Sequence, residues 1–216
     1  MTRPRLILFR GTGEPLHGGM LGPLTHGLPA GVDVVEAAYR AEIPPLGTQP
    51  LPASVAQGRR MAVDLDRHGP WVGAGYSLGA YLLGHAVAAD HLQNCLGVVL
   101  LADPLRDRRQ VSNNGVGRDR WGIAGERWVP GRVRSYAIPD DPITALSRSN
   151  PMRFVSDLVT GRRQPFGGLW PAGAGASAVW RYAATGRHTA YGVERMPGDH
   201  RTYVEAARDD VLAMLS

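Results

Sequence analysis

The sequence predicts an α/β fold: one doubly wound domain over residues 1–216, whose central, mostly parallel five-stranded sheet is flanked by helices. Short apolar runs alternate with amphipathic segments along the chain, and 44% of the residues are hydrophobic. A chain of 216 residues can bury a sizeable core without covalent links. Its single cysteine excludes an intramolecular disulfide, and with it the class of small disulfide-bonded secreted scaffolds.

The expected elements alternate in chain order. The strands are predicted at residues 6–9, 32–38, 71–76, 95–102 and 133–138. Helices are predicted at 54–66, where Ser54 serves as N-cap, at 78–92, and from the capping box Thr202–Glu205 to Leu215. The inner sides of the first and last helix are expected to carry Val55, Met61, Ala62 and Leu65, and Val204, Ala207, Val211 and Leu215, respectively. Two segments rich in Gly, Arg and Trp, at about 106–130 and 161–186, follow strand ends and are expected to be variable loops bordering a site.

Charge and hydropathy exclude two classes of partner. The net charge is +5 and every basic residue is arginine, but the arginines are scattered and do not interleave with aromatic residues. We therefore expect no nucleic-acid partner. The apolar run near the N-terminus has only four residues, too few for a signal peptide, and no run approaches a membrane span. The sequence predicts no integral membrane segment and synthesis in the cytoplasm.

The strongest chemical signal is Gly75-Tyr-Ser77-Leu-Gly79. It matches the G-x-S-x-G pattern and lies between a predicted strand and a predicted helix, the context of a nucleophile elbow. Ser77 would then stand at the helix N-terminus, where the Leu78 amide can stabilise a developing oxyanion. A chance match in a glycine-rich chain is the alternative reading.

A serine nucleophile needs a histidine base and a carboxylate that orients it. Asp140 and Asp141 follow the fifth strand, where this acid is expected, although they also fit a turn that only ends the strand. Asp103, after the fourth strand, competes with them. His188 and His200 both lie between the fifth strand and the last helix, and from its position in the chain either could contact Ser77. Four further histidines have no supporting motif: His68 and His85 are expected to be structural, and His17 and His26 lie in the loop after the first strand.

The second oxyanion donor is expected in Gly11-Thr12-Gly13-Glu14, with Thr12 as the candidate. This glycine-rich loop is not a phosphate-binding P-loop, since the chain has no lysine. Dispersed histidines and one cysteine give no ligand pair at metal-binding spacing, and Cys95 is expected to be a buried hydrophobe. The sequence therefore predicts no metal and no cofactor.

Taken in order, several segments resemble the lysin B esterases of actinobacterial phages, relatives of cutinases within the α/β-hydrolase fold. The matching segments are Arg10-Gly-Thr-Gly-Glu-Pro15, the elbow, Asp103-Pro104, Gly122-Ile-Ala-Gly125, Tyr136-Ala-Ile-Pro-Asp-Asp-Pro-Ile143 and His188-Thr-Ala-Tyr191. The resemblance implies hydrolysis of the ester joining mycolic acids to arabinogalactan in the host envelope, by a protein made in the host cytoplasm and released to act there. It implies Ser77 as nucleophile, Asp141 as acid and His188 as base, with Thr12 and Leu78 in the oxyanion hole. Leu78 departs from the family's frequent glutamine.

The same resemblance implies that segment 161–186 shapes an acyl groove, with apolar candidates Phe166, Leu169, Trp170 and Trp180. A surface loop without such a role is the alternative. The expected partner is mycolyl-arabinogalactan or another long-chain lipid ester. Two other functions stay open: a cutinase- or lipase-like esterase of broad specificity, and a non-catalytic wall-binding phage protein.

Overall fold

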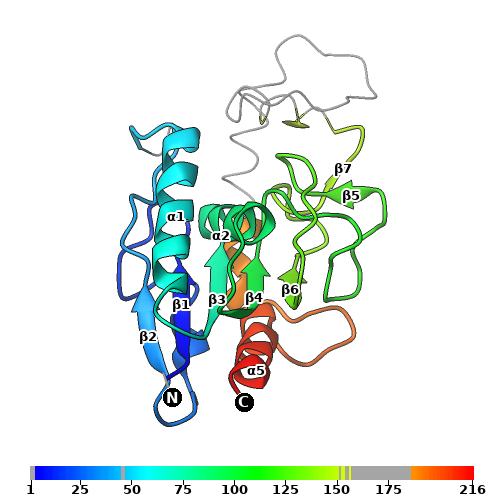
Figure 1. Ribbon diagram of the computed structural model, residues 1–216. Helices are drawn as coiled ribbons and strands as arrows, with labels where there is room; N and C mark the ends of the chain where they lie inside the picture. The colour runs from blue at the N-terminus through cyan, green and yellow to red at the C-terminus, as the bar shows by residue number, and fades with distance from the viewer. Residues whose placement is uncertain (1–2, 45–46, 151, 154–155, 157–185) are drawn as a thin grey trace.

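A five-stranded parallel sheet forms the centre of the molecule, in the order β2-β1-β3-β4-β6 (Figure 1). The computed structural model describes residues 3–44, 47–150, 152–153, 156 and 186–216. Every predicted strand is present, and the sequence-based bounds differ from the observed ones by a few residues at most. The strands are β1 (Arg5–Phe9), β2 (Asp33–Glu36), β3 (Trp71–Tyr76), β4 (Cys95–Leu101) and β6 (Val133–Tyr136).

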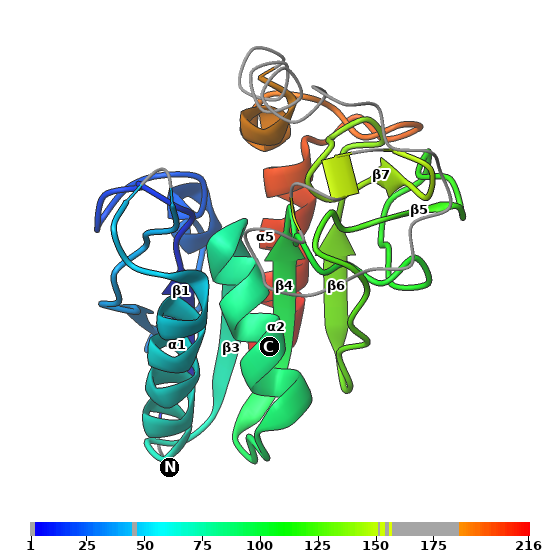
Figure 2. The ribbon, with the colours of Figure 1, turned by 90° about the horizontal axis from the view of Figure 1, so that it is seen from above.

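Helices cover both faces of this sheet, as the predicted fold class requires. Figure 2 shows α1 (Leu51–Asp66) and α2 (Leu78–Ala89) on one face and α5 (Tyr203–Leu215) on the other. Successive strand residues point to opposite faces. In β1, Ile7 and Phe9 pack in the core beside α1 and α2, whereas Leu6 and Leu8 pack in the core beside α5. The apolar runs of the sequence thus fill two cores.

Helix α1 begins earlier than the sequence analysis predicts. Pro50 is its N-cap, and Pro52 lies in the first turn, where a missing N–H costs no helical hydrogen bond. The assignment of Ser54 as N-cap is therefore wrong. Ser54 is buried inside the helix, and its hydroxyl donates to the Glu42 carbonyl at 2.8 Å.

The start of α5 agrees with the predicted capping box. The Thr202 side chain accepts a hydrogen bond from the Glu205 amide at 3.2 Å, and the Glu205 carboxylate accepts one from the Thr202 amide at 2.7 Å. The predicted apolar stripe of this helix is buried along its whole length. The cap satisfies two backbone donors that the helix itself leaves without partners.

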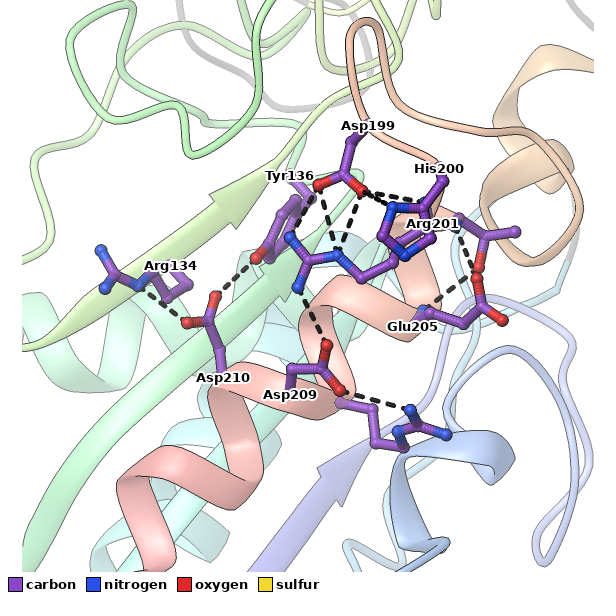
Figure 3. Close-up of polar contacts among 10 residues, drawn as sticks. Arg134, Tyr136, Asp199, His200, Arg201, Glu205, Asp209 and Asp210 are labelled. Carbon is purple, nitrogen blue, oxygen red and sulfur yellow. Dashed lines mark hydrogen bonds and ion pairs between the residues drawn. The ribbon is translucent and has the colours of Figure 1, made fainter.

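Polar contacts tie the segment before α5 to that helix, and the helix to strand β6 (Figure 3). Arg201 binds Asp199 at 2.7 Å and Asp209 at 2.9 Å. Asp210 accepts hydrogen bonds from the Tyr136 hydroxyl at 2.5 Å and from the Arg134 guanidinium at 3.1 Å. These contacts fix the chain that leads from the short 3-10 helix η2 (Arg187–Gly192) into α5.

The segment at 106–130, expected to be a variable loop, contains regular structure. Its strand β5 (Arg120–Trp121) pairs with β7 (Leu146–Ser147) in a small antiparallel sheet. Arg106 is 1% exposed, and its guanidinium donates to the carbonyls of Thr144, Asp107 and Arg120. Two-residue strands are too short to leave a hydropathy period, so the sequence predicts neither of them. Most of the second expected loop, residues 161–185, lies outside the described residues.

Candidate active site

The candidate site lies at the carboxyl edge of the sheet, where β1 and β3 are neighbours. From β1 the chain crosses to β2 on one side, and from β3 it continues to β4 on the other. Loops leaving such a pair of strands diverge, and open α/β sheets bind their ligands at this point. The Thr12 loop follows β1, and Ser77 follows β3 directly.

Ser77 occupies a strained turn between β3 and α2. Its backbone has φ 54° and ψ −115°, a conformation that L residues rarely adopt. A Cβ atom on Gly75 would lie 2.7 Å from the Ala80 nitrogen, and one on Gly79 would lie 1.8 Å from the Phe9 carbonyl oxygen. Both glycines are therefore required for the close approach of strand, helix and the chain leaving β1.

Three of the predicted residues form a continuous hydrogen-bonded chain. Ser77 Oγ lies 2.8 Å from His188 Nε2, and His188 Nδ1 lies 3.0 Å from Asp141 Oδ2. A carboxylate only accepts hydrogen bonds, so Nδ1 carries the proton and donates to Asp141. Nε2 is then free to accept the proton of the Ser77 hydroxyl. This is the arrangement in which a serine can be activated as a nucleophile.

The carboxylate of Asp141 is fully buried and accepts three hydrogen bonds. Besides His188, the Ile143 amide donates to Oδ1 at 2.9 Å, and the Tyr191 hydroxyl donates to Oδ2 at 2.8 Å. Neighbouring Asp140 instead forms an ion pair with Arg187 at 2.5 Å. Of the two adjacent aspartates, the structure thus brings only Asp141 to the histidine.

Asp103 and His200, the other residues considered as acid and base, lie outside this hydrogen-bonded chain. Asp103 is buried in an ion pair with Arg127 at 2.7 Å, and Arg127 also donates to the Tyr81 carbonyl in α2. The side chain of His200 is 91% exposed and lies 3.6 Å from Asp199 (Figure 3). Asp103 therefore serves to anchor the chain after β4, and His200 belongs to the ion-pair cluster before α5.

The two backbone amides predicted for the oxyanion hole are available to a ligand. Among the described residues, neither the Thr12 amide nor the Leu78 amide donates a hydrogen bond. The loop that carries Thr12 is held by Glu14, whose carboxylate accepts from the Gly11 amide at 2.6 Å and from the Met20 amide at 2.8 Å. A loop fixed in this way can present a preorganised donor to a developing oxyanion.

The remaining candidates do not enter the triad geometry. Phe166, Leu169, Trp170 and Trp180 lie outside the described residues. The His17 side chain is 87% exposed, His26 and His68 are exposed, and His85 packs edge to face on Tyr81 with ring centroids 4.8 Å apart. In the described part of the chain, no group of three or more His, Cys, Asp or Glu residues is arranged to hold a metal ion. Nor does any helix there have the length and apolar character needed to span a membrane.

Two tyrosines that the sequence analysis gave no role contact the triad. The Tyr76 hydroxyl donates to the His188 carbonyl at 2.7 Å, and its ring stacks on the imidazole with centroids 5.4 Å apart. The Tyr191 hydroxyl reaches Asp141, and burial raises the pKa of both hydroxyls. Their positions in the sequence already place both tyrosines near the triad: Tyr76 precedes Ser77, and Tyr191 follows His188 by three residues, about one turn of a 3-10 helix.

Comparisons with known proteins identify the fold. No family model and no curated protein matches the sequence. Among solved structures, an acetylxylan esterase aligns over 100% of this chain and 99% of its own, with 14% identity and a TM-score of 0.62, and a second acetylxylan esterase structure gives 15% and 0.60. A cutinase-like protein from Cryptococcus sp. aligns over 74% of this chain and 88% of its own, with 19% identity and a TM-score of 0.51. Together with the sheet order, these likenesses show that the chain has an α/β-hydrolase fold of the cutinase-like type.

Proposed function

We propose that this protein is a serine esterase that hydrolyses carboxylic esters through an acyl-enzyme. The hydrogen-bonded chain from Ser77 through His188 to the buried Asp141, built on a strained elbow, carries the proposal. The likeness of the fold to acetylxylan esterase and to a cutinase-like protein supports the same reaction class.

Each triad residue has one task in this reaction. Ser77 Oγ attacks the ester carbonyl carbon while its proton passes to His188 Nε2, and the imidazolium is stabilised by Asp141. The amides of Thr12 and Leu78 donate to the oxyanion of the tetrahedral intermediate. The intermediate collapses, the alcohol leaves with the proton from Nε2, and Ser77 is acylated. A water molecule, deprotonated by His188, then attacks the acyl-enzyme; the bond to Ser77 Oγ breaks, Nε2 returns the proton to Oγ, and the acid is released.

For the substrate, we propose the ester between mycolic acids and arabinogalactan in the envelope of a mycolic-acid-containing host. The ordered set of motifs that resembles phage lysin B supports this substrate. In that role the protein is made in the host cytoplasm and acts on the envelope after release, aiding lysis. Segment 161–186 would supply the acyl groove, with Phe166, Leu169 and Trp170 among its apolar side chains.

A second candidate substrate is a short acyl ester on a polysaccharide. The acetylxylan esterase fold aligns with the whole chain, which favours this reading over a lipid ester of unspecified type. A cutinase- or lipase-like esterase of broad specificity is the third enzymatic reading. A wall-binding protein without activity is disfavoured by the orientation of the three triad side chains.

The reaction class is tested by covalent labelling. A fluorophosphonate probe should label the wild-type protein and should not label Ser77→Ala, since the probe reacts with an activated serine. His188→Ala should abolish both labelling and ester turnover, whereas His200→Ala, which changes an exposed histidine, should retain both. An unlabelled wild-type protein, or equal effects of the two histidine changes, would contradict the proposal.

The substrate is tested by comparing three ester classes at equal enzyme concentration. Release of free mycolic acid from purified mycolyl-arabinogalactan is compared with release of acetate from acetylated xylan and with hydrolysis of p-nitrophenyl esters of increasing chain length. Faster hydrolysis of the mycolyl ester than of the other esters, together with loss of that hydrolysis in Ser77→Ala, supports the lysin B role. Preference for acetylated xylan supports the second candidate and contradicts the first.

A further inference from the structure

Tyr191 joins the triad through a bond that the proposed mechanism does not use. The residue is fully buried, and its hydroxyl lies 2.8 Å from Asp141 Oδ2. That same oxygen accepts the Nδ1 proton of His188 at 3.0 Å. One carboxylate oxygen therefore serves two donors, one from the tyrosine and one from the histidine.

The direction of the tyrosine bond is determined by a third group. The Ile138 amide lies 3.1 Å from the Tyr191 oxygen, and an amide N–H can only donate. The tyrosine oxygen is thus the acceptor toward Ile138, which leaves its own proton for Asp141. Burial, together with the charge of Asp141, raises the pKa of Tyr191 well above 10. The hydroxyl therefore stays protonated and donates throughout the pH range in which esterases are assayed.

We propose that Tyr191 is a positioning residue that weakens the basicity of Asp141 toward His188. This inference rests on the proposed esterase function. A carboxylate oxygen that already accepts a hydrogen bond is a weaker acceptor for a second donor, and it stabilises an imidazolium less. Tyr191 therefore keeps His188 unprotonated down to lower pH than Asp141 alone would allow, while holding the carboxylate in its orientation.

The surroundings allow this effect to be isolated. Rings of Tyr76 on β3 and Tyr203 on α5 lie edge to face with Tyr191, with centroids 6.3 and 5.3 Å away. The Tyr203 hydroxyl is buried and has no hydrogen-bond partner among the described residues. Other charged groups near the triad are Arg106, Glu14 and the surface ion pairs of Arg187 with Asp140 and Glu194. A Tyr203→Phe variant thus removes a tyrosine hydroxyl from a ring that packs on Tyr191, without removing a hydrogen bond to any described residue.

The test is the pH profile of kcat/KM for a soluble p-nitrophenyl ester. In Tyr191→Phe we expect the acid limb to move up by about half a pH unit or more, and kcat/KM below that limb to fall about threefold or more, because a hydrogen bond to a charged group is lost. Tyr203→Phe should leave the limb in place. A purely structural role for Tyr191 lowers activity equally at all pH values, so an unmoved limb, or the same shift in Tyr203→Phe, overturns the proposal.

A second variant covers the case in which Tyr191→Phe does not fold, since Ile138 loses its acceptor. Incorporation of 3-fluorotyrosine at position 191 alone keeps ring and hydroxyl but makes a stronger donor, and it should move the acid limb to lower pH; an upward shift overturns the proposal.

Proton NMR gives a readout that needs no turnover: the low-field signal of the His188–Asp141 proton should titrate at higher pH in Tyr191→Phe than in the wild type, and unchanged titration overturns the inference. A wild-type protein with no ester turnover would reject the esterase function, whereas normal turnover with indistinguishable tyrosine variants would reject only the role of Tyr191.

Discussion

Gly79→Ala tests whether the elbow and the Thr12 loop work as one unit. The added Cβ would lie 1.8 Å from the Phe9 carbonyl oxygen and 2.7 Å from that of Arg10, whereas real Cβ atoms essentially never come closer than 3.0 Å. The two segments must therefore separate by about 1.2 Å. Both obstacles are backbone atoms at the end of β1, so no side-chain rotation can relieve the contact.

The expected effect is larger on activity than on stability. Overpacking costs about 1–3 kcal/mol, and the better helix propensity of alanine offsets up to about 1 kcal/mol of it. A displacement of about 1 Å in an active site lowers the rate by roughly 100-fold, and here it moves the loop carrying Thr12 away from Ser77. We expect kcat/KM to fall about 100-fold or more in a protein that still folds.

The assay combines kcat/KM for a p-nitrophenyl ester with urea unfolding of the same preparations. Gly22→Ala is the matched control, since a Cβ at Gly22 meets nothing within 4 Å and its φ is not positive. This control should keep wild-type activity and stability. A Gly79→Ala variant with wild-type kcat/KM would refute the idea that the loop after β1 is positioned by its contact with α2.

Three further predictions concern the triad aspartate, a buried ion pair and a surface ion pair. Asp141→Asn should lower kcat by about 10⁴-fold, the loss typical when a triad aspartate is replaced, whereas Asp140→Asn should retain activity within a fewfold, as measured by steady-state kinetics. Arg127→Met leaves its carboxylate partner buried without a counter-charge and should lower the free energy of unfolding by about 3–5 kcal/mol in urea titrations; a loss below 1 kcal/mol would contradict the structural role of this pair. Hydrogen bonds from Arg201 hold the pKa of Asp199 well below its usual range, so this stabilisation is present above about pH 4 and is lost as the pH falls; the Tm should drop in acid, and the drop should be shallower in Arg201→Gln.

Local patterns in the sequence account for most of the secondary structure. Period-two and continuous apolar runs predict the five strands, because burial of a strand depends on its own side chains. The capping box before α5 can be predicted from the sequence because its two partners, Thr202 and Glu205, lie within four residues. The start of α1 was misplaced because Ser54 resembles an N-cap locally, while its partner Glu42 is 12 residues away along the chain. Strands β5 and β7 escape prediction for another reason: each has only two residues, too few for a hydropathy period, and each is stabilised by pairing with the other.

The sequence by itself determined the candidate nucleophile, because an elbow needs only five adjacent residues between a strand and a helix. Motif spacing alone left Asp103, Asp140 and Asp141 open as the acid and His188 and His200 as the base, and the resemblance implied Asp141 and His188. The tertiary structure brings these two into hydrogen-bond contact with each other and with Ser77. His188 meets Ser77 across 111 residues of chain, and Asp141 meets His188 across 47. The contact of Tyr191 with Asp141 spans 50 residues. Such contacts depend on where the sheet edge, η2 and α5 are placed in space, so only the packed fold assigns them.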